Sequence, residues 1–169
     1  MRSKAFLASI VCGLIAIAVQ PKSAAAATPT LAGSWRFTLT PTVPPTPVVP
    51  PVIPIPGLVT FTPNGSTIET DGSEFAPSPT TTVAAQTPGH GIWENGPTPG
   101  SLYVEYISLV LNPNGSLFGE NVTTMLVSLS TNGKAFMGSY TTVQEANGVT
   151  TTVSGGTVNG TLIPKVPLP

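Results

Sequence analysis

The dipeptide Asn-Gly recurs six times in this 169-residue chain, and its positions limit the possible folds more than any other feature does. Asn-Gly favours the positive φ angles of the type I′ turn, which joins two antiparallel strands in a tight hairpin. Four of the six dipeptides lie between segments in which polar and apolar residues alternate, and these four predict hairpins. They begin at Asn64, Asn114, Asn132 and Asn147.

The other two Asn-Gly dipeptides predict different structures. Asn95 is closely followed by Pro97 and Pro99, which indicates a looser turn. Asn159 lies inside a strand-like segment, where Gly160 is typical of a bulge or of a bend in a barrel.

The segments between these turns predict an all-β fold. Thr and Val are abundant, whereas Lys, Glu and Arg, which favour helices, are scarce. In the first segment, alternation places Trp35, Phe37 and Leu39 on one face. The predicted strands are Gly33–Thr40, Gly57–Thr62, Ser66–Asp71, Gly89–Glu94, Ser101–Leu111, Ser116–Ser130, Lys134–Ala146 and Val149–Ile163.

Eight strands joined mostly by tight turns predict a single antiparallel up-and-down β-barrel. Closure of the barrel would remove the exposed sheet edges that promote aggregation. The alternative is a β-sandwich, which needs connections that cross between two sheets. The tight turns after Leu111 leave no room for such connections.

Two segments fall outside this pattern. Pro41–Pro56 contains eight prolines among Val and Ile, which predicts an extended polyproline II insertion that packs on the barrel wall or mouth. Gly72–Pro88 is rich in Ser, Thr and Pro and predicts an exposed loop.

The N-terminus predicts export. Arg2 and Lys4 precede the apolar run 5–19, and a series of alanines follows it, which is the pattern of a cleavable signal peptide. We therefore expect a signal peptide at residues 1–27 and one barrel domain at residues 28–169. The mature protein would be secreted or periplasmic, without stable insertion into a membrane.

Charge and cysteine content narrow the range of partners. Without residues 1–27 the chain keeps three basic residues, Arg36, Lys134 and Lys165, against seven acidic ones, a net charge of −4. A weakly acidic chain lacks the clustered cations that nucleic acids require. The single cysteine, Cys12, lies within the predicted signal peptide, so no disulfide is expected.

Several short motifs carry a resemblance to a known group. Gly33-Ser34-Trp35 resembles the Gly-x-Trp start of lipocalins and their calycin relatives. The segments 57–65, 88–93 and 155–161 are similar, in order and content, to small secreted bacterial proteins of unassigned function. Those proteins are described as lipocalin-like or as similar to the allene oxide cyclase barrel. The resemblance implies a calycin-type barrel, and it transfers no catalytic residue to this chain.

The side chains that could line a ligand cavity are aromatic, apart from one histidine. An eight-stranded barrel either fills its interior with side chains or holds one small ligand. The candidates are Trp35, Phe37, His90, Trp93, Tyr103, Tyr106, Phe136 and Tyr140.

Catalytic and metal-binding motifs are not recognisable in the sequence. His90 is the sole histidine, which is too few for a zinc site, and no cofactor is expected. The neighbouring acids Glu69, Asp71 and Glu74 lack a calcium-loop pattern, and we expect them to lie in a solvated turn.

Three functions remain open. The first is a non-enzymatic module that binds a small apolar molecule or a partner protein. The second is a cofactor-free cyclase or isomerase that acts on an apolar substrate inside the barrel. The third is a structural barrel that meets a partner through its Pro-rich segment. Assembly into an oligomer is compatible with all three.

Overall fold

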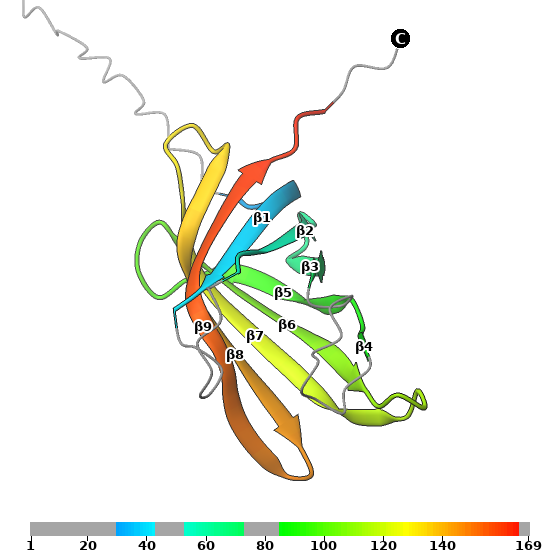
Figure 1. The fold of residues 1–169 in the computed structure, drawn as a ribbon. Helices are drawn as coiled ribbons and strands as arrows, with labels where there is room; N and C mark the ends of the chain where they lie inside the picture. Colours follow the sequence, from blue (N-terminus) through cyan, green and yellow to red (C-terminus); the bar gives the residue numbers. More distant parts are fainter. Residues whose placement is uncertain (1–29, 43–52, 73–84, 166–169) are drawn as a thin grey trace, which may run out of the picture.

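The computed structural model describes residues 30–42, 53–72 and 85–165 (Figure 1). The expected signal peptide and most of the Pro-rich segment and of the Ser/Thr/Pro-rich loop lie outside these residues. Among the described residues, none belongs to a helix that is long and apolar enough to cross a membrane.

The described chain forms β-strands joined by turns. All neighbouring strands pair in the antiparallel sense. The strands are β1 (Gly33–Pro41), β2 (Ile55–Phe61), β3 (Ser66–Asp71), β4 (Ala85–Gln86), β5 (Gly89–Asn95), β6 (Ser101–Leu111), β7 (Leu117–Leu129), β8 (Ala135–Ala146) and β9 (Val149–Leu162).

Eight of these strands close into a barrel, as the sequence predicts, and the sandwich alternative is wrong. Around the wall the order is β1, β2, β3, β5, β6, β7, β8 and β9, and β9 pairs back with β1. The short strand β4 is additional. It pairs with the end of β6, through Ala85 with Leu111 and Gln86 with Val110, in line with β5 (Figure 1).

Two predicted boundaries are corrected by the structure. Ile55 and Pro56, assigned to the Pro-rich insertion, form the start of β2, where they pair with Leu39 and Thr38. The predicted loop Gly72–Pro88 is interrupted by β4. Pairing with a neighbouring strand explains both corrections, because it brings into the sheet Pro56 and Ala85, which have weak strand propensity of their own.

The turn type is correctly predicted at only one of the four hairpins. Asn147 and Gly148 both have positive φ, 53° and 73°, as a type I′ turn requires. At the other three hairpins the glycine alone has positive φ, and the amide of the second residue after asparagine donates to its Oδ1. Pro63 and Pro113 explain two of these turns, since proline holds φ near −65°. A type I turn followed by a left-handed glycine results.

Interior glycines make room for aromatic rings from neighbouring strands. A Cβ atom built on Gly160 would lie 2.2 Å from the Phe136 ring, and one built on Gly57 would lie 2.4 Å from the Phe37 ring. Gly160 lies inside β9 and pairs in regular register with Phe37 and Phe136, so the strand has no bulge at this glycine. Its missing side chain admits Phe136 to the core.

We expect Gly160→Ala to destabilise the barrel by about 1–3 kcal/mol, because the added methyl group overpacks the buried Phe136 ring. Chemical denaturation measures the change. Gly155→Ala is the matched control on the same strand, since its Cβ would meet no atom closer than 3.5 Å. Equal stability of the two variants would contradict this account of the core.

Candidate functional site

The barrel interior is apolar at the end where β1 begins. Trp35 Nε1 donates a hydrogen bond of 2.7 Å to the carbonyl of Leu31, which holds the segment before β1 against the core. The Trp35 and Phe136 ring centroids lie 5.2 Å apart, and Phe136 also meets Phe61 edge to face. The buried side chains of this end pack together and include Leu31, Trp35, Phe61, Leu102, Val127 and Phe136.

The opposite end of the interior is polar. It lies where β1, β3 and β6 end and where β7 and β9 begin. The buried polar side chains of the interior that lie towards this end are Glu69, Asp71, Ser108, Asn121, Thr123 and Thr142, accompanied by Tyr106 and Tyr140. We call these six polar side chains, together with Ser154, the interior polar cluster; Tyr106 and Tyr140 adjoin it.

Two carboxylates of β3 face the interior. Glu69 is 2% exposed and Asp71 is 8% exposed, and residues two apart on a strand point to the same side. Each of these two side chains lies beside an aromatic ring, and both the acid and the ring pack over a glycine of a neighbouring strand. A Cβ on Gly89 would meet the Tyr106 ring at 2.4 Å and Glu69 Oε2 at 2.9 Å. A Cβ on Gly57 would meet the Phe37 ring at 2.4 Å and Asp71 Cβ at 2.9 Å.

The two interior tyrosines respond to these carboxylates. Burial raises the pKa of Tyr106 well above its ordinary value, the charges of Glu69 and Asp71 raise it further, and a hydrogen bond with Thr123 opposes the rise. Burial and the charge of Asp71 also raise the pKa of Tyr140, while its 2.8 Å hydrogen bond with Ser154 lowers it. Both phenols are therefore neutral near pH 7 and can donate or accept a hydrogen bond.

A chain of amide side chains continues the cluster outward. Gln86 of β4 donates to Ser108 at 2.8 Å and accepts from Asn121 at 2.8 Å, and Asn121 accepts from Gln144 at 3.2 Å. The short strand β4 thus places a polar side chain among the other strands of this end.

The barrel wall is irregular at the same end. The pairing of β6 with β7 shifts between Val110 and Leu111, and that of β8 with β9 shifts between Thr142 and Val143. The pairing of β3 with β5 stops at Glu69 and Gly89, and β4 pairs with β6 but not with β3. Bulges are frequent beside binding and active sites, where they redirect side chains. Interior chemistry and wall geometry therefore point to the same end of the barrel.

Six of the eight ligand-lining candidates from the sequence lie on the interior face of the wall. Trp35, Trp93 and Phe136 belong to the apolar end, and Phe37, Tyr106 and Tyr140 adjoin the interior polar cluster.

The other two candidates, His90 and Tyr103, do not lie in the interior, and their assignment was wrong. His90 is exposed on the outer wall between Ile68 and Ile107, and Tyr103 faces outward beside Glu94. The reason is the strand period of two, because residues three apart point to opposite sides. Trp93 and Tyr106 face inward, so His90 and Tyr103 face outward.

The outer wall carries a tyrosine–carboxylate pair of its own. Tyr103 Oη donates a hydrogen bond of 2.6 Å to Glu105 Oε2. This bond, with some burial and the charges of Glu105 and Glu94, raises the pKa of Tyr103 to about 12. The pair has the same residue types as the interior polar cluster but lies on the opposite face of β6.

Sequence reasoning missed the interior carboxylates. Glu69 and Asp71 were expected in a solvated turn, and the structure buries both. The available signal was the period of two, since Thr67, Glu69 and Asp71 share one face of β3. That face looked like the outer one because it holds the polar residues, whereas the exposed face of β3 carries Ile68.

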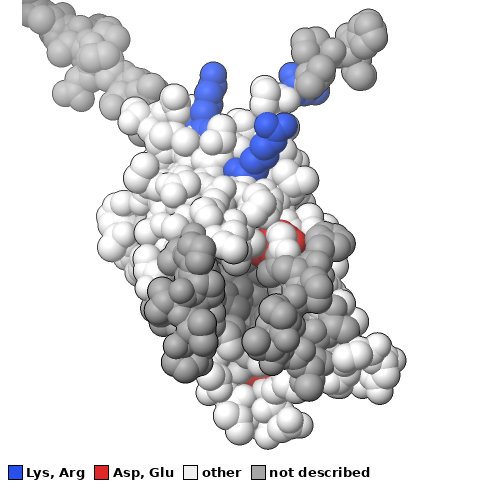
Figure 2. All heavy atoms as spheres, in the orientation of Figure 1, with Lys and Arg blue, Asp and Glu red and all other residues white. Residues whose placement is uncertain are grey.

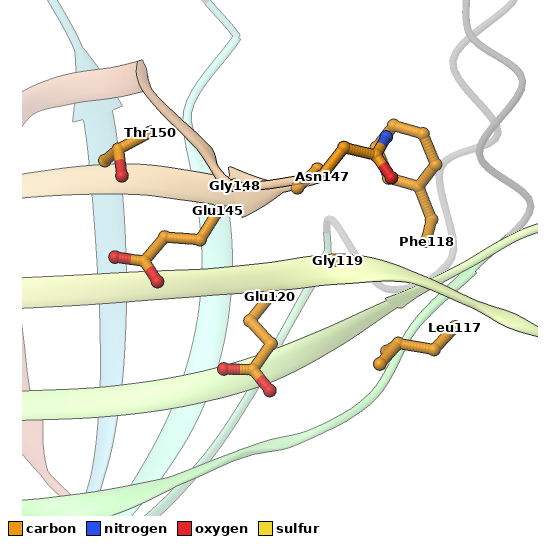
Figure 3. Close-up of a pocket in the computed structure, with 9 residues that line it drawn as sticks. Leu117, Phe118, Gly119, Glu120, Glu145, Asn147, Gly148 and Thr150 are labelled. Carbon is orange, nitrogen blue, oxygen red and sulfur yellow. The ribbon is translucent and has the colours of Figure 1, made fainter.

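A hollow lies outside the barrel, between the start of β7 and the turn that joins β8 to β9 (Figure 3). Glu120 and Glu145 are direct cross-strand partners there, and Figure 3 shows both side chains on the same side of the sheet. Within the described ranges, no group of three or more His, Cys, Asp or Glu side chains is placed to hold a metal ion. We take the interior polar cluster as the candidate site because it places two buried carboxylates beside aromatic rings.

Charge is distributed unevenly along the barrel. Figure 2 shows the Lys and Arg side chains grouped at the end where β1 begins and β9 ends. The basic residues of the described chain are Arg36, Lys134 and Lys165. The interior polar cluster, with its two carboxylates, lies toward the other end.

The comparisons with known proteins returned nothing: no family model, no curated protein and no solved structure matches this chain.

The raised pKa values predict how the protein responds to alkali. All three tyrosines of the chain have a folded pKa above the value of about 10 that they take when unfolded. Above pH ~10 the unfolded chain loses phenol protons that the folded chain retains, so stability is complete below this pH and falls as the pH rises.

Ultraviolet titration of phenolate measures this effect. We expect almost no phenolate in the folded protein at pH ~10, where free tyrosine is half ionised. Phenolate should appear together with unfolding at higher pH. A tyrosine that ionises near pH 10 while the protein stays folded would contradict the burial and hydrogen bonding described here.

Proposed function

We propose that this chain is an exported calycin-type barrel that binds one small molecule at the interior polar cluster. The observation that carries the proposal is the placement of Glu69 and Asp71 beside Tyr106 and Tyr140 inside an eight-stranded wall. Burial of carboxylates away from water is costly, and it recurs at functional sites because such groups bind or react strongly there.

The division of the interior supports this choice over a purely structural barrel. The apolar end supplies a packed core, in which the Phe136 ring contacts both Trp35 and Phe61. Two carboxylates on the interior face of β3 are an unusual choice for a purely structural core, because apolar residues often replace buried charged groups without loss of stability.

The ligand we propose has an apolar body and at least one polar group. The polar group would meet the carboxylates, the phenols and the Ser154 hydroxyl, while the apolar body would lie against Phe37 and Leu39. Small-molecule sites in proteins typically combine an apolar lining with a few such convergent polar groups.

A catalytic role is the second candidate, and one observation favours it. Tyr106 keeps its proton to high pH and lies beside the Glu69 carboxylate, which pairs a hydrogen-bond donor with an acceptor for protons. Such a pair could shift a proton within a bound substrate, as isomerisation or cyclisation requires. The reaction would need no cofactor, because the substrate itself supplies the bonds that change.

We expect native mass spectrometry of the protein, purified without detergent, to detect a small molecule that is released on denaturation. Tyr106→Phe should reduce the bound fraction about three- to tenfold, because it removes one neutral hydrogen bond. Tyr103→Phe is the matched control, since it makes the same change on the outer wall of the same strand.

Two outcomes would count against small-molecule binding. One is a protein mass without a bound molecule, both as purified and after incubation with an extract of the culture medium. The other is an equal loss of ligand in Tyr103→Phe and Tyr106→Phe, which would place the ligand elsewhere on the barrel.

A further inference from the structure

We propose that the ligand of the interior polar cluster is an organic cation, a protonated amine carried on an apolar or aromatic body. This inference rests on the proposed function and names the chemical class of its ligand. It derives from a juxtaposition that occurs twice inside the barrel: a carboxylate and an aromatic ring that meet at one interior glycine.

The first of these pairs is formed by Asp71 and Phe37. Both side chains pack over Gly57, since a Cβ atom built there would lie 2.4 Å from the Phe37 ring and 2.9 Å from Asp71 Cβ. The second pair is formed by Glu69 and Tyr106 at Gly89, at 2.9 Å and 2.4 Å. A carboxylate neutralises an ammonium group, and a ring face attracts the same cation through its quadrupole.

Hydroxyl oxygens complete the set of acceptors. An ammonium group has three N–H donors and no acceptor. Tyr140 and Ser154 share a hydrogen bond of 2.8 Å, and the charge of Asp71 acts on the Tyr140 phenol, so these two hydroxyls lie in the neighbourhood of this carboxylate. Asp71 is also the more exposed of the two interior acids, which makes it the first that a ligand would meet.

The hydroxyl of Thr67, on the same interior face, has no hydrogen-bond partner among the described residues. Thr67 is 1% exposed, and its Oγ1 makes no hydrogen bond within the described part of the chain. A buried hydroxyl without a partner costs free energy, so such a group is usually matched by water or by a ligand. Thr67 thus adds a second, neutral acceptor to the interior face that carries Glu69 and Asp71.

The sign of the charge disfavours an anionic ligand inside the barrel. A carboxylate ligand would approach two interior carboxylates, and like charges repel strongly at low dielectric. A groove across β1, β2 and β3 is lined by Asp71 and Phe37 together with Arg36, so the first carboxylate–ring pair borders a groove in the barrel wall.

Calorimetric titration with three probes of similar size tests this inference: 2-phenylethylamine, 2-phenylethanol and phenylacetate. We expect the amine to bind at least tenfold more tightly than the alcohol, since a hydrogen bond to a charged group is worth about one factor of ten. Phenylacetate should bind most weakly. Asp71→Asn should weaken amine binding about tenfold and change alcohol binding less than about twofold.

The controls separate this inference from the proposed function. Glu105→Gln removes a carboxylate from the outer wall and should leave all three affinities unchanged. If Asp71→Asn does not fold, Phe37→Leu takes its place and should weaken amine binding about threefold while sparing the alcohol.

Each remaining outcome overturns a defined claim. Equal binding of the amine and the alcohol, lost in Tyr106→Phe, would refute the cationic ligand and leave the interior binding site standing. Preferential binding of phenylacetate would refute it, because the site would then select an anion. Failure of all three probes to bind would refute the cationic ligand, whereas a protein mass without a bound molecule in the native spectrum would refute the proposed function.

Discussion

Closure of the wall is the constraint on which the rest of this structure depends. The pairing of β6 with β7 and of β9 with β1 joins the two ends of one sheet. An eight-stranded barrel has room for one set of side chains or for one small ligand among them. Large rings therefore enter where a neighbouring strand presents a glycine, as Phe136 does at Gly160, Phe37 at Gly57 and Tyr106 at Gly89. These three glycines therefore determine where the aromatic rings lie, and the Phe37 and Tyr106 rings are what the carboxylate side chains of β3 pack beside.

The same narrow interior gives ordinary residues unusual properties. Tyr106 and Tyr140 hold their protons because water is excluded and because Glu69 and Asp71 lie nearby. The packed apolar end supplies the stability that a polar cluster inside a small domain requires. Tyr103 and Glu105 have the same chemistry on the outer face of β6, where solvent screens their charges. Position in the barrel, rather than residue type, separates the candidate site from a surface pair.

Local pattern predicted most of the fold because local interactions determine it. Alternation and Asn-Gly turns gave strand boundaries within about two residues of those observed, apart from β4. The sequence pattern does not predict β4, because two residues are too few to show an alternation of polar and apolar positions. Only the pairing with β6 makes them a strand. The turn type was wrong at three hairpins, where the asparagine side chain caps the turn and only the glycine is left-handed.

The candidate site was predictable only in part. Phe37, Tyr106 and Tyr140 were expected inside the barrel from their aromatic character, and they border the cluster. His90 is a candidate because of its chemistry, but it lies three residues from the inward-facing Trp93 on the same strand and therefore points outward. Glu69, Asp71 and Gln86 were missed because charged and amide side chains are rarely buried, so a sequence pattern assigns them to the surface.

The sequence by itself determined that this chain forms antiparallel strands in a fixed order with tight turns between them. These properties depend on backbone preferences and on a period of two, which operate within a few residues. Only the tertiary structure decided which face of each strand became the interior. That choice depends on closure, because one inward face per strand must fit a shared and limited volume. On β3 the interior face carries Glu69 beside Tyr106 and Asp71 beside Phe37, although carboxylates on their own prefer water.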